Sequence, residues 1–145
     1  MPDAHLLTNL LYRYAELVDA GDLEGVGELF ADAEIVVDGT VICRGADGIV
    51  ALLGSMVRIH ADGTPRTKHI ITNPIVEFGP HADRATVRSY YTVVQQTDRL
   101  PLQIVAAGRY RDEFRLRDGH WRFAVRDYSY LDFVGDVGDH LLGGR

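Results

Sequence analysis

Two residues whose side chains suit proton transfer stand beside predicted elements of the chain. Asp19 closes a stretch with a helical apolar pattern, and His69 lies near the start of a long stretch of strand character. A carboxylate that binds one imidazole nitrogen fixes the tautomer and leaves the other nitrogen free to take a proton. If the fold brings Asp19 and His69 together, the chain holds a general base such as lyases, isomerases and hydrolases use.

Simpler interpretations of both residues stay open at the level of sequence. An aspartate followed by Ala20 and Gly21, as Asp19 is, commonly lies in a solvated loop that ends a helix. A histidine on a strand, such as His69, can bond to the backbone alone. Periodicity does not predict a contact between residues so far apart in the chain.

The first part of the chain carries helical patterns interrupted by one hairpin. Residues 7–18 repeat apolar side chains at spacings of three and four, which predicts a helix. A short second helix is expected over 23–30 and a third over 46–60. Between them, residues 33–43 are predicted to form a hairpin, because Asp38-Gly39 is a typical turn signal.

The second part of the chain has the character of strands. Turn residues separate four long candidates, which cover 67–78, 85–96, 102–116 and 121–130. Helices followed by an uninterrupted run of strands predict the α+β class with an antiparallel meander. Strands of this length usually bend, so we expect a strongly curved sheet that wraps the helices and leaves a pocket at its mouth.

Length and composition predict one domain that covers residues 1–145. A chain of 145 residues with 46% hydrophobic and 25% charged residues is large enough to bury its own core. Residues 135–145 are rich in glycine and are expected to form a loop-like tail that frays or covers a neighbouring molecule.

Several classes of partner are not expected. A net charge of −6, with no cluster of basic residues, argues against nucleic acid and anionic membranes, and no apolar run is long enough to span a bilayer. The single cysteine, Cys43, and an N-terminus unlike a signal peptide predict a cytoplasmic location. Histidines at metal-ligand spacing and glycine-rich phosphate loops are missing from the sequence, so neither a metal nor a cofactor is predicted.

Three further residues are candidates for the pocket. Tyr14 lies one helical turn and a little more before the end of the first helix, and Tyr110 shares a strand face with Asp112. Strict alternation places Arg126 on one face with Arg122, and a solvated surface is the simpler interpretation of that face.

Several stretches together resemble a known family. They are residues 12–22 with their terminal aspartate, 29–33, Gly45, 66–69, and the closing pair 108–114 and 118–123. The pattern is similar to the SnoaL-like branch of the NTF2-like superfamily, near scytalone dehydratase and hexachlorocyclohexane dehydrochlorinase. The resemblance implies a cone-shaped NTF2-like (cystatin-like) fold, in which a strongly curved antiparallel sheet wraps over three N-terminal helices.

The resemblance also implies roles for individual residues. Asp19 and His69 match the catalytic dyad of these enzymes, and Arg126 matches an arginine that could stabilise departing negative charge. Ser89, however, stands where scytalone dehydratase has its second histidine, and Tyr110 stands near the position of its pocket asparagine. The dyad is therefore retained without the groups that polarise the carbonyl, which puts scytalone in doubt as the substrate.

Three functions remain after this comparison. The first is a cofactor-independent, dehydratase-like lyase or isomerase that acts on a small, mostly apolar cyclic molecule through the Asp19–His69 base. The second is a non-catalytic ligand-binding or assembly domain, like the β-subunit of a ring-hydroxylating dioxygenase. The third is an epoxide hydrolase with Asp112 as the second carboxylate. In each case a homodimer or homotrimer is expected through the convex sheet, with Trp121, Phe123 or the strand tyrosines as anchors.

Overall fold

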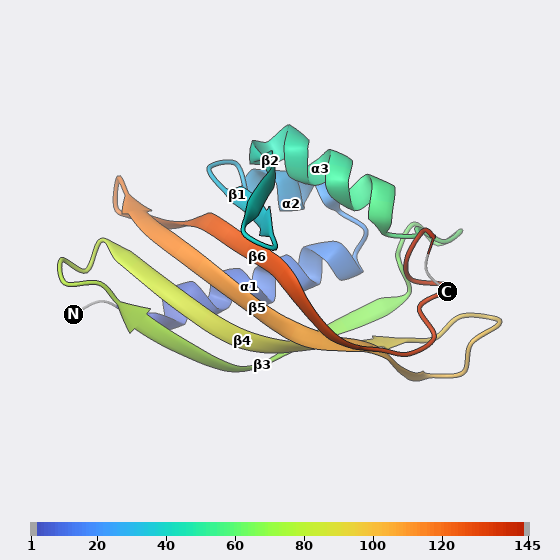
Figure 1. Ribbon diagram of the computed structural model, residues 1–145. Helices are drawn as coiled ribbons and strands as arrows, with labels where there is room; N and C mark the ends of the chain where they lie inside the picture. Colours follow the sequence, from blue (N-terminus) through green and yellow to red (C-terminus); the bar gives the residue numbers. More distant parts are fainter. Residues whose placement is uncertain (1–2, 144–145) are drawn as a thin grey trace.

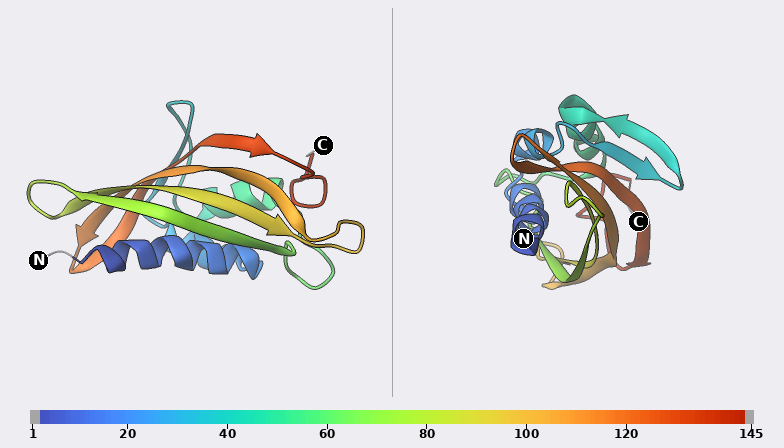
Figure 2. Two further views of the ribbon diagram at one scale, coloured as in Figure 1. Left: turned by 90° about the horizontal axis from the view of Figure 1, so that it is seen from below. Right: turned by 90° about the vertical axis from the view of Figure 1, so that its left-hand side faces the viewer.

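A strongly curved sheet of six strands wraps around the first helix (Figures 1 and 2). The computed structural model describes residues 3–143. Its elements are α1 (Ala4–Asp19), α2 (Leu23–Leu29), β1 (Glu34–Val37), β2 (Thr40–Arg44), α3 (Gly45–Met56), β3 (Thr67–Phe78), β4 (Arg84–Gln95), β5 (Gln103–Arg117) and β6 (His120–Val134). The predicted α+β class is confirmed, and the predicted elements lie within a few residues of the observed ones.

The sheet is mixed rather than wholly antiparallel as the sequence predicted. Its strand order is β2-β1-β6-β5-β4-β3, and β3 to β6 form the expected antiparallel meander. β1 instead runs parallel to β6 and pairs with it only over Val125–Asp127. The short pairing follows from the hairpin, which turns back after Val37 at Asp38 and Gly39, both with positive φ.

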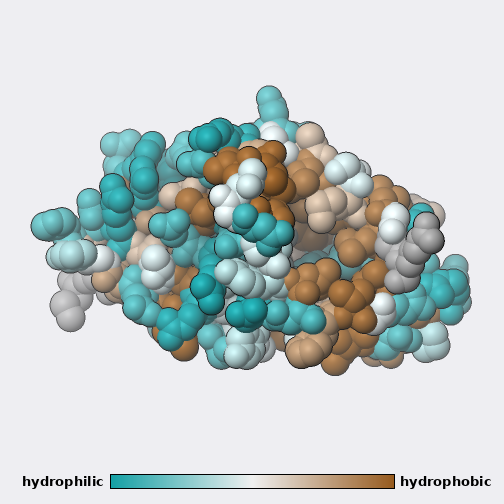
Figure 3. Space-filling view, in the orientation of Figure 1, coloured by the Kyte–Doolittle hydropathy of each residue, from teal (hydrophilic) through white to brown (hydrophobic). Residues whose placement is uncertain are grey.

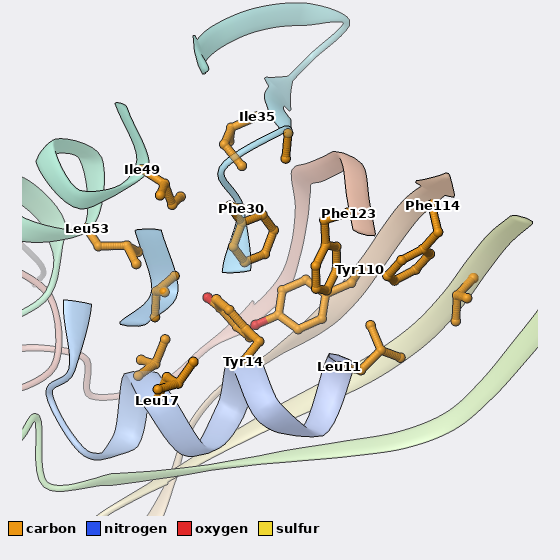
Figure 4. Close-up of a cluster of buried hydrophobic side chains, with 14 of the residues drawn as sticks. Leu11, Tyr14, Leu17, Phe30, Ile35, Ile49, Leu53, Tyr110, Phe114 and Phe123 are labelled. Carbon is orange, nitrogen blue, oxygen red and sulfur yellow. The ribbon is translucent and has the colours of Figure 1, made fainter. Parts of the chain in front are cut away.

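α1 fills the concave face of the sheet, while α2 and α3 pack against each other beside β1 and β2 (Figure 1). The apolar stripe of α1 supplies Leu7, Leu11, Tyr14 and Leu17 to the core. The stacked rings of Phe30 and Phe123 and the neighbouring Phe114 continue this core toward the turn between β5 and β6 (Figure 4). Burial of each such side chain stabilises the fold by about 1.5–3 kcal/mol before the entropic cost of ordering it.

A bulge in β6 changes which side chains point inward. Phe114 pairs with Phe123, but the preceding Glu113 pairs with Val125, so β6 contains one extra residue at this point. Strict alternation was therefore wrong for this strand: Arg126 is completely buried, while Arg122 stays exposed. Phe123 is also completely buried, which rules it out as an anchor on the convex face.

The tail after β6 packs against its own chain over the described residues 135–143. α3 ends at Met56, earlier than predicted, because Val57 turns to extended backbone and forms a β-bridge with Leu141. Arg99 binds the carboxylates of Asp136 and Asp139, with nitrogen–oxygen distances of 3.0–3.2 Å. These contacts carry the tail across the end of the sheet and toward α3.

The concave face remains open beside the last part of β6. Leu131 and Val134 pair with Gly108 and Ala106, so they lie on the same face of the sheet as the inward side chains of β4 and β5. Both are nevertheless exposed, by 42% and 54%, and they lie beyond the part of β6 that pairs with β1. The surface is hollowed between α3 and this part of β6, and hydrophobic residues edge the hollow (Figure 3).

Candidate functional site

Asp19 at the end of α1 and His69 near the start of β3 are in direct contact. The Oδ1 atom of Asp19 lies 2.6 Å from Nδ1 of His69, and Oδ2 accepts a hydrogen bond of 2.7 Å from the His69 backbone N–H. The Thr67 hydroxyl donates a third hydrogen bond of 2.8 Å to the same carboxylate. Both side chains are almost buried, with 8% of Asp19 and 6% of His69 exposed.

The end of α1 and the start of β3 bring this pair together. Gly21 takes a φ of +75° and turns the chain directly after the helix, and a Cβ at this position would lie 2.1 Å from the carbonyl oxygen of Gly63. A residue with a side chain does not fit such an approach, so the glycine fixes how α1 ends beside the loop that leads into β3. Thr67 and His69 alternate inward on β3 and reach the helix end from the other side.

The contacts of the carboxylate define the state of both groups. Burial raises the pKa of Asp19, but hydrogen bonds from His69 and Thr67 and the charge of His69 outweigh burial, so that this pKa lies below its ordinary value. An ionised carboxylate only accepts, so Nδ1 of His69 carries the proton that lies between them. Nε2 then holds the free lone pair. It makes no hydrogen bond within residues 3–143, and it is not among the buried polar atoms that lack a partner, so water-sized groups can reach it.

A groove on the seam between α1 and β3 leads to the pair. It has a volume of about 570 Å³ and is lined by Asp19 and His69 together with Tyr12, Ala15, Glu16, Ala20, Thr64, Lys68 and Ile71. The walls combine apolar surface with one acidic and one basic side chain. This groove gives a small organic molecule a way to the dyad.

Four tyrosines form an aromatic cluster on the concave side of the sheet. The hydroxyls of Tyr14 and Tyr128 are hydrogen-bonded at 2.7 Å, and the rings of Tyr91 and Tyr110 stack at 4.3 Å. Tyr14 and Tyr110 direct their hydroxyls toward the side on which Leu17 lies (Figure 4). The hydroxyls of Tyr91 and Tyr110 have no partner within the described residues, yet neither is a sealed polar atom. Burial raises the pKa of Tyr91 to about 12, so its hydroxyl stays protonated and can donate.

Arg126 lies inside this aromatic cluster and binds Asp112 with two hydrogen bonds. The distances are 2.7 Å from Nε and 3.0 Å from Nη2, and neither side chain has any exposed surface. The guanidinium carbon lies 4.2 Å from the ring centre of Tyr14 and 3.8 Å from that of Tyr110. Burial raises the pKa of Asp112, an effect that the charge of Arg126 opposes. Arg126 keeps its positive charge inside the cluster, and its third nitrogen, Nη1, is sealed from solvent.

The structure thus brings together the residues singled out in the sequence, in two groups. Asp19 and His69 form one group, while Tyr14, Tyr110 and Arg126 form the other. The sequence left open which of two adjacent tyrosines faces inward, and the register settles this: Tyr91 pairs with Gly108 on the concave face, and Tyr90 lies outside. His140 was not singled out, since it stands in a glycine-rich tail, but its ring lies 5.8 Å from that of His69.

Residues 3–143 contain no cluster of three or more histidine, cysteine, aspartate or glutamate side chains arranged to hold a metal ion. None of the helices within the same range is long and apolar enough to cross a bilayer.

Comparison with known proteins shows the fold and the family of the chain. Among curated proteins no match was found. A solved structure of an NTF2-like protein with a cystatin-like fold from Novosphingobium aromaticivorans shares 25% identity at a TM-score of 0.71, over 90% of this chain and 82% of the other. A Mycobacterium tuberculosis protein of unknown function shares 27% identity at a TM-score of 0.69, over 90% of this chain and 72% of the other.

A third solved structure and a family model extend the comparison. A scytalone dehydratase candidate from Novosphingobium aromaticivorans shares 22% identity at a TM-score of 0.65, over 92% of each chain, and this likeness shows the fold. The family model described as the SnoaL-like domain matches residues 2–127, which is most of the chain. The protein therefore belongs to the SnoaL-like family of the NTF2-like superfamily.

Proposed function

We propose that the protein is a cofactor-independent lyase or isomerase of the dehydratase type. The observation that carries this proposal is the hydrogen bond between Asp19 and Nδ1 of His69, with Nε2 left free and within reach of a small molecule. The family includes dehydratases and isomerases, in accord with such chemistry. Apolar side chains around the hollow and the groove favour a small, mostly apolar cyclic substrate.

Proton abstraction from carbon is the step that this arrangement favours. Nε2 of His69 takes the proton, and the carboxylate of Asp19 stabilises the imidazolium that forms. In this proposal the free hydroxyls of Tyr91 and Tyr110 donate hydrogen bonds to an enolate or a departing group. Arg126 acts through its positive field beside Tyr110 rather than by touching the substrate, because its free nitrogen is sealed.

Replacement of His69 tests the proposal. His69→Gln keeps a polar side chain of similar size but removes the base, so turnover should fall by about 10²–10⁴-fold. The assay follows water loss by ultraviolet absorption on a panel of cyclic β-hydroxyketones, whose products are conjugated. His81→Gln is the matched control, since His81 is exposed in the turn after β3 and should keep wild-type turnover.

Thermal unfolding of both variants shows whether any loss is structural. Wild-type turnover in folded His69→Gln would contradict the assignment of the base. If the wild-type protein shows no turnover on the panel but binds its members, the non-catalytic ligand-binding alternative gains support. The epoxide hydrolase alternative is weaker, since Asp112, its second carboxylate, is fully buried against Arg126.

The convex face of the sheet supports self-association as a homodimer or homotrimer. Ile70, Thr92, Ala107 and Phe133 form one cross-strand row on this face. Ile70 and Phe133 are 45% and 74% exposed, which is costly for apolar side chains in water. Analytical ultracentrifugation should therefore give a mass of two or three times 16.1 kDa.

Two charge substitutions locate the interface. Phe133→Asp should shift the protein toward the monomer, because it places a charge in the apolar row. Leu6→Asp changes an equally apolar, exposed side chain on α1, away from the sheet, and should leave the mass unchanged. A monomeric wild-type protein at micromolar concentration would refute this part of the proposal. The cytoplasmic location stays a prediction from the sequence.

A further inference from the structure

His140 stands at an unusual place for a titratable residue in a terminal tail. Only 5% of it is exposed, and its ring packs edge-on against His69, with an interplanar angle of 68°. Its Nδ1 atom is sealed and has no hydrogen-bond partner in the described structure, whereas Nε2 is not sealed. An unpaired buried nitrogen is costly, so packing alone gives no reason for a histidine here.

The tail around His140 is held from several sides. Its backbone carbonyl accepts a hydrogen bond of 2.8 Å from the Arg58 backbone N–H. The preceding residue, Asp139, binds Thr97 and Arg99 through its carboxylate, and its carbonyl lies 2.7 Å from Nε2 of His60. These contacts hold the backbone at Asp139 and His140 in place, with the ring of His140 beside His69.

We propose that His140 is a second functional group of the site, and that its Nε2–H donates a hydrogen bond to a substrate oxygen while His69 removes a proton from the adjacent carbon. The inference deepens the proposed function and rests on it. It narrows the substrate class to molecules with an oxygen next to the acidic carbon, such as a ring ketone with a hydroxyl group at the β-carbon. The SnoaL-like domain model ends at residue 127, before this histidine.

The chemistry of the step balances without a further reactant. The C–H bond breaks, its proton moves to Nε2 of His69, and the electron pair passes to the carbonyl oxygen, which becomes an enolate. The N–H of His140 stabilises that oxyanion without giving up its proton. The pair then returns to form the C=C bond as the C–O bond to the β-hydroxyl breaks, and the imidazolium of His69 protonates the hydroxide that leaves as water.

The tautomer of His140 follows from its surroundings. Burial lowers its pKa to about 4, and the neighbouring His69 acts in the same direction, so the ring is neutral at pH 7 and carries one N–H. An orphaned buried N–H is rarer in proteins than an orphaned acceptor. The proton therefore resides on Nε2, the nitrogen that is not sealed, and this nitrogen acts as a donor.

Nitrogen-15 NMR of the histidine side chains tests this assignment on the free protein. Long-range ¹H–¹⁵N spectra between pH 6 and 8 should show His140 as the neutral Nε2–H tautomer, with the signal identified by its loss in His140→Phe. The Nδ1–H tautomer or a charged ring at pH 7 would overturn the inference. This arm needs no substrate, so it is independent of the proposed function.

Binding of 4-nitrophenolate, an enolate mimic, tests the donor. His140→Phe should weaken its binding by about tenfold to a hundredfold, the usual effect of losing one hydrogen bond to a charged group. His140→Gln retains an N–H donor in a side chain of comparable length and should recover part of the affinity. His81→Phe, in an exposed turn, is the control and should bind as the wild type does.

The outcomes separate the two proposals. Equal binding by folded His140→Phe and wild type would overturn the role of His140, while a loss of turnover in His69→Gln would still support the proposed function. Equal losses in His140→Phe and His140→Gln would mean that the residue only holds the tail in place, and would also overturn the inference. If the wild-type protein does not bind 4-nitrophenolate at all, the role of His140 as an oxyanion donor is overturned, while the turnover of His69→Gln still decides the proposed function.

Discussion

Replacing Arg126 with methionine should lower the free energy of unfolding by about 3–5 kcal/mol, the cost of leaving a buried charge without its partner. Arg126 and Asp112 have no exposed surface, and both oxygens of the carboxylate are bound by the guanidinium. The substitution removes the positive partner of the Asp112 carboxylate and also leaves the rings of Tyr14 and Tyr110 without the cation that packs against them. Methionine fills much of the volume of the arginine side chain, so the loss of stability reflects mainly the lost charge.

A double-mutant cycle separates the pair from its surroundings. Asp112→Leu should be destabilising by a similar amount, since it leaves the guanidinium unpaired. The double variant Asp112→Leu with Arg126→Met should be more stable than either single variant, because no buried charge remains. Urea denaturation of the four proteins measures these differences. Additive losses would show that the two side chains do not form a functional ion pair.

The polar core that this experiment examines was only partly predictable from the sequence. The alternation of apolar residues located β3 to β6, because a half-buried strand imposes a period of two. The same rule failed at Arg126, since a bulge adds one residue between Phe123 and that arginine. A bulge depends on the pairing of two strands, and local composition gives no direct signal of it.

The candidate site shows the same division between local and long-range information. The sequence pattern showed that Asp19 ends a helix and that His69 is one of the first residues of a strand. The contact between them was predicted only from the resemblance to a family. The contact depends on the chain turning at Gly21 and on the inward phase of β3. Neither the sequence pattern nor the resemblance to the family predicted the position of His140. That position depends on the β-bridge between Val57 and Leu141, and no periodic pattern in the sequence indicates this bridge.

The protein contains two groups of charged or titratable side chains that differ in their access to solvent. One is the ion pair of Arg126 and Asp112, and the other is formed by His69 and His140. Arg126 and Asp112 form an ion pair inside the core, and neither side chain is exposed to solvent. His69 has one nitrogen held by Asp19 and the other free, and His140 has one nitrogen sealed and the other free. The two ring nitrogens that are free to bind a substrate, Nε2 of His69 and Nε2 of His140, therefore belong to neighbouring rings.

The buried state of His140 should make folding stability depend on pH between about 4 and 6.5. The pKa is about 4 in the folded protein and about 6.5 in an unfolded chain, so the unfolded state binds more protons throughout this window. The free energy of unfolding therefore rises with pH across the window and levels off above it. One pKa unit corresponds to about 1.4 kcal/mol, so the total change is roughly 3 kcal/mol.

Other titratable groups also change the free energy of unfolding with pH, and their contributions must be separated from that of His140. The ring of His69 packs against that of His140, and the charge of Asp19 acts on it. The pKa of Asp19 is lowered, so its contribution to stability is fully present above pH 3.8 and is lost only at lower pH. The raised pKa of the distant Asp112 has the opposite sign and acts in acid. A comparison with His140→Phe cancels both effects.

Urea denaturation of the two proteins from pH 5 to 7.5 measures the difference directly. The wild-type protein should gain stability relative to His140→Phe as the pH rises to about 6.5, and the difference should then stay constant. Parallel curves would mean that His140 is not buried beside His69 in solution. A slope confined to the expected window would show that the tail stays closed over the dyad, because a frayed tail would leave His140 with the pKa of the unfolded chain.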